Sequence, residues 1–190
     1  MTRLLLKLAT LCLLLAPQAS HAYFIATLGS SPLDPTKTSR ILLSGRGTDL
    51  GIQPQRSALG RALLYQRNFP GQQIVLISVF EDAGNEAALK RAGWIIGNKN
   101  STNLETVAAV TELKRFTKIR SLELFGHNSP SIGTQTDGKG MRFDPSNPIV
   151  NHLAGNFDNR SFVMIHGCNS GWILAQSLSK IWKTAVAGSF

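Results

Sequence analysis

The sequence has little cysteine and little acidic charge. Its 190 residues contain two cysteines, Cys12 and Cys168, and 20 lysines and arginines against 11 aspartates and glutamates, which gives a formal net charge of +9. So few cysteines exclude a fold that is held together by several disulfides. No pair of thiolates or histidines has the spacing of a zinc site, so no metal is expected. Packing of a hydrophobic core must therefore hold the fold.

The amino-terminal residues have the pattern of an export signal. Two basic residues precede an apolar run at residues 8–16, and residues 20–22 put small side chains at the two positions that a signal peptidase reads. The apolar run is too short to be a permanent membrane-spanning helix. We expect residues 1–22 to be cleaved, which predicts a secreted or periplasmic protein without stable membrane insertion. The remaining residues, 23–190, contain Cys168 as their only cysteine.

The basic excess raises the question of an anionic partner. The lysines and arginines are scattered, and the densest cluster consists of Arg115, Lys118 and Arg120. Nucleic-acid binding is typical of massed basic residues, so a nucleic-acid partner is not expected and a solvated basic surface is favoured. The alternative, a protein that binds anionic surfaces through its charge, predicts association that weakens steeply with salt.

Apolar segments alternate with amphipathic segments along residues 23–190. Short, nearly continuous apolar runs are typical of parallel strands that are covered on both faces. They predict five main strands, at residues 41–43, 73–80, 121–125, 162–165 and 184–189, with a further extended piece at 94–97. Helices are predicted at residues 57–68, 86–92, 102–116, 148–155 and 172–182. This alternation predicts one α/β domain, with a mostly parallel sheet of about five main strands and helices on both faces.

One predicted helix carries a recognisable start signal. Thr102 and Glu105 have the spacing of a capping box, in which the side chain of each residue accepts a hydrogen bond from the backbone N–H of the other. The third predicted helix is therefore expected to open at Thr102.

His127 and Cys168 each follow directly after a predicted strand. Sites in an open parallel sheet form at the carboxyl ends of the strands, and these two strands are consecutive in the sequence. A cysteine with an imidazole within reach is a common nucleophilic arrangement, and Gly167 and Gly171 would allow backbone N–H groups to approach a substrate carbonyl. Taken singly, each residue is more often structural, the cysteine as a small hydrophobe and the histidine as a hydrogen-bonded loop residue. Both interpretations stay open on the residues alone.

Two segments resemble caspase-like cysteine peptidases. Residues 122–131 (LELFGHNSPS) are similar to the histidine-bearing strand end of these enzymes. Residues 163–171 (VMIHGCNSG), with 174–178 (LAQSL) and 185–189 (AVAGS), are similar to their cysteine-bearing strand, the helix after it and the next strand. The likeness is greatest to bacterial branches: CHAT-type domains, self-cleaving domains of large secreted toxins, and a caspase-like domain at the start of large adhesins.

The resemblance implies a three-layer caspase-like fold and an endopeptidase that acts on a protein or peptide substrate, or on itself. Cys168 would be the nucleophile and His127 the general acid that protonates the leaving amine. The backbone N–H groups of Asn128 and Cys168 would hold the oxyanion. The resemblance implies no cofactor. Candidates for the substrate pocket are Arg46, Ser129, His166 and Asn169.

A departure from the family leaves a second interpretation open. These peptidases usually have glycine directly after the catalytic histidine, where this chain has Asn128. The sheets of these peptidases also commonly have six main strands, whereas five are predicted for this chain. The alternative is a catalytically inactive caspase-like module that binds a partner at the cell envelope, and such a module would tolerate the loss of the Cys168 thiol.

Overall fold

The structure is a computed structural model. It describes residues 23–45, 53–79, 83–100, 104–129, 133–135, 142–168 and 170–189. The predicted export signal, residues 1–22, lies outside the described residues, and so does Thr102. Within the described ranges, no helix combines the length and the apolar composition that a membrane crossing needs.

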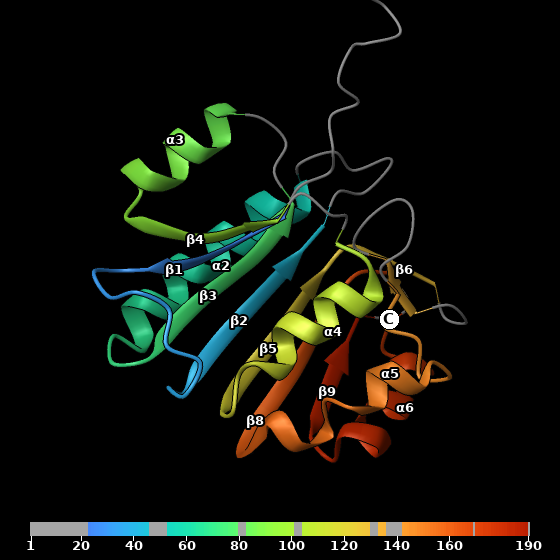
Figure 1. The fold of residues 1–190 in the computed structure, drawn as a ribbon. Helices are drawn as coiled ribbons and strands as arrows, with labels where there is room; N and C mark the ends of the chain where they lie inside the picture. Colours follow the sequence, from blue (N-terminus) through green and yellow to red (C-terminus); the bar gives the residue numbers. More distant parts are fainter. Residues whose placement is uncertain are drawn as a thin grey trace, which may run out of the picture.

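A seven-stranded sheet forms the centre of the molecule (Figure 1). Its strands lie in the order β4-β1-β3-β2-β5-β8-β9. Strands β3, β2, β5, β8 and β9 run parallel to one another, whereas β1 is antiparallel to both of its neighbours, β3 and β4. The bounds are β1 (Tyr23–Leu28), β2 (Ser39–Ser44), β3 (Gln73–Val79), β4 (Trp94–Asn100), β5 (Ile119–Phe125), β8 (Phe157–His166) and β9 (Ala185–Gly188).

The α/β class is confirmed, and the five predicted main strands are all present as β2, β3, β5, β8 and β9. The predicted strand number is wrong, because the described part of the sheet has seven strands and is not purely parallel. β4 extends the piece expected at residues 94–97, and β1 was not expected at all. β1 follows the predicted export signal directly, and its apolar run ends at residues 29–32 (GSSP), a composition typical of turns.

Helices cover both faces of the sheet, and Figure 1 shows α2 behind it and α4 in front. One face carries α2 (Gln53–Asn68) and α3 (Ala83–Arg91). The other face carries α4 (Thr106–Lys114), α5 (Pro148–Asn151) with a following 3₁₀ turn (Ala154–Asn156), and α6 (Leu174–Trp182).

Several helix boundaries differ from the predicted ones. α2 begins at Gln53, a turn earlier than predicted, and Pro54 fits its first turn because proline needs no N–H partner there. The predicted capping box is wrong, because Glu105 is itself the N-cap of α4 and its side chain makes no capping hydrogen bond. α6 begins at Leu174, slightly later than the sequence predicted, so a short turn separates it from Cys168.

The side chains of β5 divide between two different environments. Leu122 and Leu124 join the apolar core under α4 and α6. Successive side chains of a strand point to opposite faces, so Ser121, Glu123 and Phe125 face α2. The carboxylate of Glu123 is fully buried on that face. A charged group inside a sheet needs partners, and these lie close to the candidate site.

Candidate active site

The strands that carry the two predicted catalytic residues are neighbours in the sheet. β5 and β8 pair in parallel, with Phe125 opposite His166, and the amide of Gly126 donates a hydrogen bond to the carbonyl oxygen of His166 at 3.4 Å. His127 and Cys168 each lie two residues beyond this last pair. Both residues therefore belong to the same rim, at the carboxyl ends of adjacent strands.

His127 opens a short hairpin at this rim. β6 (His127–Ser129) pairs in antiparallel fashion with β7 (Gly133–Gln135), and His127 lies opposite Gln135. Its side chain is half-buried. Asn128 and Ser129, the predicted oxyanion and pocket residues, follow in the same extended ladder. The hairpin therefore fixes the backbone on which these three residues stand.

Cys168 lies in the turn between β8 and α6. Its thiol is free and its side chain is exposed, so a reagent in solution can reach it. Two predicted pocket residues, Arg46 and Asn169, lie outside the described residues.

The turn that carries Cys168 is held by the buried hydroxyl of Ser170. This Oγ lies 3.1 Å from the carbonyl oxygen of Ile165 and 2.9 Å from that of Gly167, so it can donate to either one. It also accepts a hydrogen bond from the amide of Ser189 at 3.0 Å. The amide of Gly171 donates to the carbonyl oxygen of Ser189 at 2.7 Å. The end of β8, the cysteine turn and the residue after β9 are thus connected through one side chain.

Two glycines permit this close contact. A Cβ at Gly171 would lie 2.9 Å from the carbonyl oxygen of Gly188 and 3.1 Å from that of Ser189. A Cβ at Gly188 would in turn overlap the Ser170 hydroxyl. The sequence predicted that Gly171 would serve the approach of a substrate, but in the structure it serves the approach of β9.

Replacing Ser170 with alanine is expected to loosen the cysteine turn. The variant loses the hydroxyl bonds to Ile165 and Gly167 and the bond from Ser189, which should lower the free energy of unfolding by about 1–3 kcal/mol. Urea unfolding measures this loss. Ser179→Ala is a suitable control, because it also removes a hydroxyl-to-carbonyl bond, to Thr184, but at the far end of α6. An equal loss in both variants would contradict a special role for Ser170.

His166 was predicted as a pocket residue, and the structure gives it a fixed orientation. Its Nε2 lies 2.6 Å from Oε2 of Glu123. Its ring stacks on that of Phe125, with centroids 4.3 Å apart and planes within 7° of parallel. The side chain keeps 35% of its surface exposed. His166 therefore presents one edge to the interior and the other toward solvent, next to Gly167 and Cys168.

The partner of His166 was missed by the sequence analysis. Glu123 has 0% of its side chain exposed, and the Nε of Arg61 in α2 contacts both of its carboxylate oxygens, at 2.9 and 3.0 Å. The Arg61 guanidinium lies over the ring of Tyr65, 5.0 Å from its centroid. The available signal was a lone acidic residue within an otherwise apolar strand, between Leu122 and Leu124.

Another arginine, which is buried, lies further along the same face. Arg40 is 5% exposed, its guanidinium lies 3.7 Å from the ring centroid of Phe69, and its Nη1 donates to Oγ of Ser121 at 3.3 Å. Burial lowers the pKa of Arg40 below its usual value, and the nearby positive charge of Arg120 lowers it further. The α2 face of the sheet thus holds several charged groups that apolar patterning alone did not predict.

The densest basic cluster of the sequence is largely engaged in ion pairs. Arg115 Nη1 contacts Glu112 Oε2 at 2.7 Å, and Arg120 Nε contacts Asp158 Oδ2 at 2.7 Å. Of the three basic residues in this cluster, only Lys118 makes no ion pair with another residue that the structure describes. This pairing reduces the positive charge that the cluster offers to an anion.

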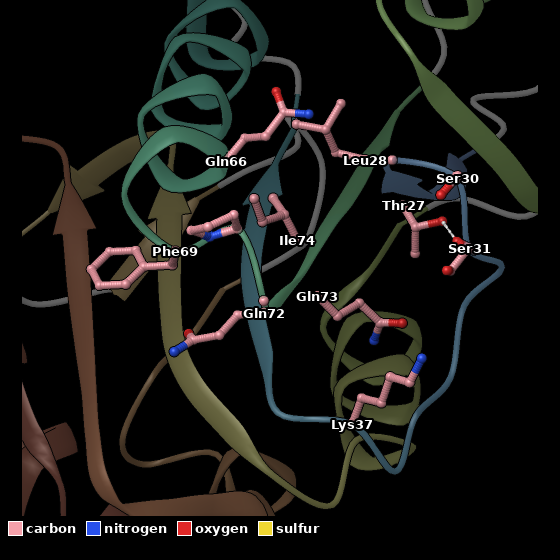
Figure 2. A pocket seen from close by; sticks show the side chains of 13 residues that line it. Thr27, Leu28, Ser30, Ser31, Lys37, Gln66, Phe69, Gln72, Gln73 and Ile74 are labelled. Atoms are coloured by element: carbon pink, nitrogen blue, oxygen red, sulfur yellow. Dashed lines mark hydrogen bonds between the residues drawn. The ribbon is translucent and has the colours of Figure 1, made fainter.

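The described residues also form a cavity of about 250 Å³, and Figure 2 shows the side chains that line it. It lies near Leu28, Phe69 and Gln73, at the amino ends of the parallel strands and therefore opposite the rim of Cys168. Lys37 is the only ionisable side chain among its lining residues.

No protein family, curated protein or solved structure matches the chain. Within the described residues, no three histidine, cysteine, aspartate or glutamate side chains are grouped so that they could hold a metal ion. The rim presents an exposed thiol, His127 on the adjacent strand end, and the oriented imidazole of His166.

Proposed function

We propose that this chain is an exported caspase-like cysteine endopeptidase, with Cys168 as nucleophile and His127 as general acid. The observation that carries the proposal is the pairing of Phe125 with His166, because His127 and Cys168 each follow two residues later. A thiol and an imidazole on adjacent strand ends meet the first requirement of a cysteine nucleophile. The export pattern at residues 1–22 supports a secreted or periplasmic location.

The proposed reaction has two halves. The Cys168 thiolate attacks the scissile carbonyl carbon, a C–S bond forms, and the negative charge on oxygen is stabilised by the backbone N–H groups of Asn128 and Cys168. The C–N bond then breaks and His127 gives its proton to the leaving amine. Water then attacks the thioester while His127 takes one of its protons, and the C–S bond breaks, which restores the thiolate and the His127 imidazolium. The carboxylic acid product loses its own proton to solvent.

The rigidity of the cysteine turn is a second support. Reacting groups must be held within about 0.5 Å of their productive geometry for efficient catalysis. The Ser170 hydroxyl and the close approach of Gly171 to Gly188 restrict the backbone on which Cys168 stands. An inert surface cysteine has no need of such a turn.

Peptide hydrolysis by the protein that begins at Tyr23 tests the proposal. With a mixed fluorogenic peptide library, Cys168→Ala is expected to lower the cleavage rate by about 10³-fold or more, because no other group replaces the nucleophile. Mass spectrometry of both proteins detects self-cleavage. Hydrolysis that persists unchanged in Cys168→Ala, or a parent protein that is folded yet cleaves nothing, would contradict the peptidase.

The second candidate is a non-catalytic caspase-like module that binds a partner at the cell envelope. Asn128 favours it, because the family usually has glycine at the position whose N–H holds the oxyanion. If this second candidate is correct, the folded parent protein should cleave no peptide in the hydrolysis assay, and Cys168→Ala should retain partner binding in full.

A further inference from the structure

Three polar side chains form a connected row that ends two residues before the candidate nucleophile. Arg61 in α2 contacts both carboxylate oxygens of Glu123 in β5, and Oε2 of Glu123 contacts Nε2 of His166 at the end of β8 at 2.6 Å. One residue, Gly167, separates His166 from Cys168. Of these three side chains only Glu123 is fully buried, while Arg61 and His166 are partly exposed.

The carboxylate of Glu123 does not need the imidazole for its own burial. A buried charge requires a partner of opposite sign and hydrogen bonds, and Arg61 supplies both in its two contacts. His166, in contrast, is partly exposed, so its ring could point into solvent without cost to the core. The contact between Glu123 and His166 is therefore not required to compensate the buried charge. Its effect is to hold the ring of His166 in one orientation.

The contacts also fix which ring nitrogen is available. A carboxylate that is paired with an arginine can only accept hydrogen bonds, so Nε2 of His166 must carry the hydrogen that lies between it and Glu123. In the neutral ring the lone pair then resides on Nδ1. Stacking against Phe125 at 4.3 Å fixes the plane of the ring. A carboxylate that orients an imidazole in this way is the arrangement of a general base in catalytic triads.

We propose that Nδ1 of His166 is the base that takes the proton of the Cys168 thiol, and that Glu123 and Arg61 are its positioning residues. This inference rests on the proposed role of Cys168 as nucleophile. The S–H bond breaks, the proton moves to Nδ1, and the electron pair stays on sulfur as the thiolate. The imidazolium is stabilised by Glu123, and His127 remains the separate acid that protonates the leaving amine.

The rate of Cys168 alkylation by iodoacetamide tests this assignment, because only the thiolate reacts. The full chain is treated between pH 5 and 9, and mass spectrometry of the Cys168 peptide measures the rate. At pH 6 we expect the folded protein to react about tenfold faster than the urea-unfolded chain. His166→Gln and Glu123→Gln should remove this enhancement. In Glu123→Gln the new side-chain amide is expected to donate to Nε2, which moves the ring hydrogen to Nδ1 and eliminates the base.

Glu112→Gln is the matched control. Glu112 is also a buried carboxylate with an arginine partner, Arg115, and it accepts a hydrogen bond from Tyr23 at 3.0 Å, but it lies on the opposite face of the sheet. This variant should keep the alkylation enhancement. Nitrogen NMR of the histidines gives a second readout, since the parent protein should show hydrogen on Nε2 of His166 and Glu123→Gln should show it on Nδ1. Melting curves of all variants establish that each one is folded.

The outcomes separate the two proposals. An enhancement that survives in His166→Gln but is lost in His127→Ala would overturn the role of His166 and leave the peptidase intact. A folded parent protein whose Cys168 reacts no faster than the unfolded chain would overturn both. If Glu123→Gln does not fold, His166→Gln decides alone, because its partly exposed side chain can be replaced without disturbing the contact of Arg61 with Glu123.

Discussion

Replacing Gly188 with alanine is expected to lower the free energy of unfolding by about 3 kcal/mol and the melting temperature by roughly 6–12 °C. The added Cβ would lie 2.7 Å from the carbonyl carbon of Ser170 and 2.8 Å from the amide nitrogen of Gly171. These atoms are backbone atoms of the cysteine turn, so they cannot move away cheaply. β9 would have to shift, which would break the bond from Gly171 to Ser189 and displace Cys168.

Thermal unfolding followed by circular dichroism measures the loss, and Gly60→Ala is the matched control. Gly60 lies inside α2, and a Cβ there would meet nothing within 4 Å. Alanine is the better helix former, so this variant is expected to be more stable than the parent protein by about 0.5–1 kcal/mol. Shifts of the same sign and size in the two variants would contradict the proposed contact between β9 and the cysteine turn.

Replacing Trp182 with alanine is expected to cost about 3–5 kcal/mol of unfolding free energy, which is typical of a large aromatic side chain lost from a core. Trp182 is 1% exposed at the end of α6, and its Nε1 donates to the carbonyl oxygen of Val150 at 2.7 Å. Its ring meets Phe143 edge-on at 6.2 Å and Phe157 at 5.4 Å. The variant leaves a cavity between α6 and α5 and removes one of the hydrogen bonds that the Val150 carbonyl accepts.

Urea unfolding at equilibrium measures this effect. The other tryptophan near α6, Trp172, is 59% exposed, so Trp172→Ala removes the same atoms from a solvated position. Its free energy of unfolding should stay within about 0.5 kcal/mol of the parent value. If Trp182→Ala is as stable as Trp172→Ala, the packing of α6 against α5 contributes little, and the helix after Cys168 is held in another way.

The sequence predicted those strands that share one simple local pattern. The parallel strands β2, β3, β5, β8 and β9 are short apolar runs bounded by polar or glycine residues, and such runs predict strands buried between helices. The rim formed by His127 and Cys168 follows from the same signal, because both residues lie directly after such runs. β1 was missed although it carries the same signal, a short apolar run (YFIATL) that ends at the turn-like residues 29–32 (GSSP).

The contacts that hold the candidate site could not be predicted, because they join residues that are distant in the sequence. Glu123 is the one acidic residue of β5, and only the packing of α2 on the sheet brings Arg61 to it. Likewise, only the pairing of β9 with β8 brings Gly188 against Ser170. The predicted capping box was wrong for a local reason. The spacing of its two residues fits, but α4 begins only after Glu105.

The connection between the cysteine turn and the residue after β9 has a consequence for the order of folding. A chain emerges from the ribosome amino end first, and β9 follows β8 and α6 in the sequence. Until Ser189 has emerged, the amide of Gly171 and the Ser170 hydroxyl lack their partners. A nascent chain can therefore form β5 and β8 while its thiol is still unplaced. The turn that carries Cys168 would be completed only after most of the sheet has formed.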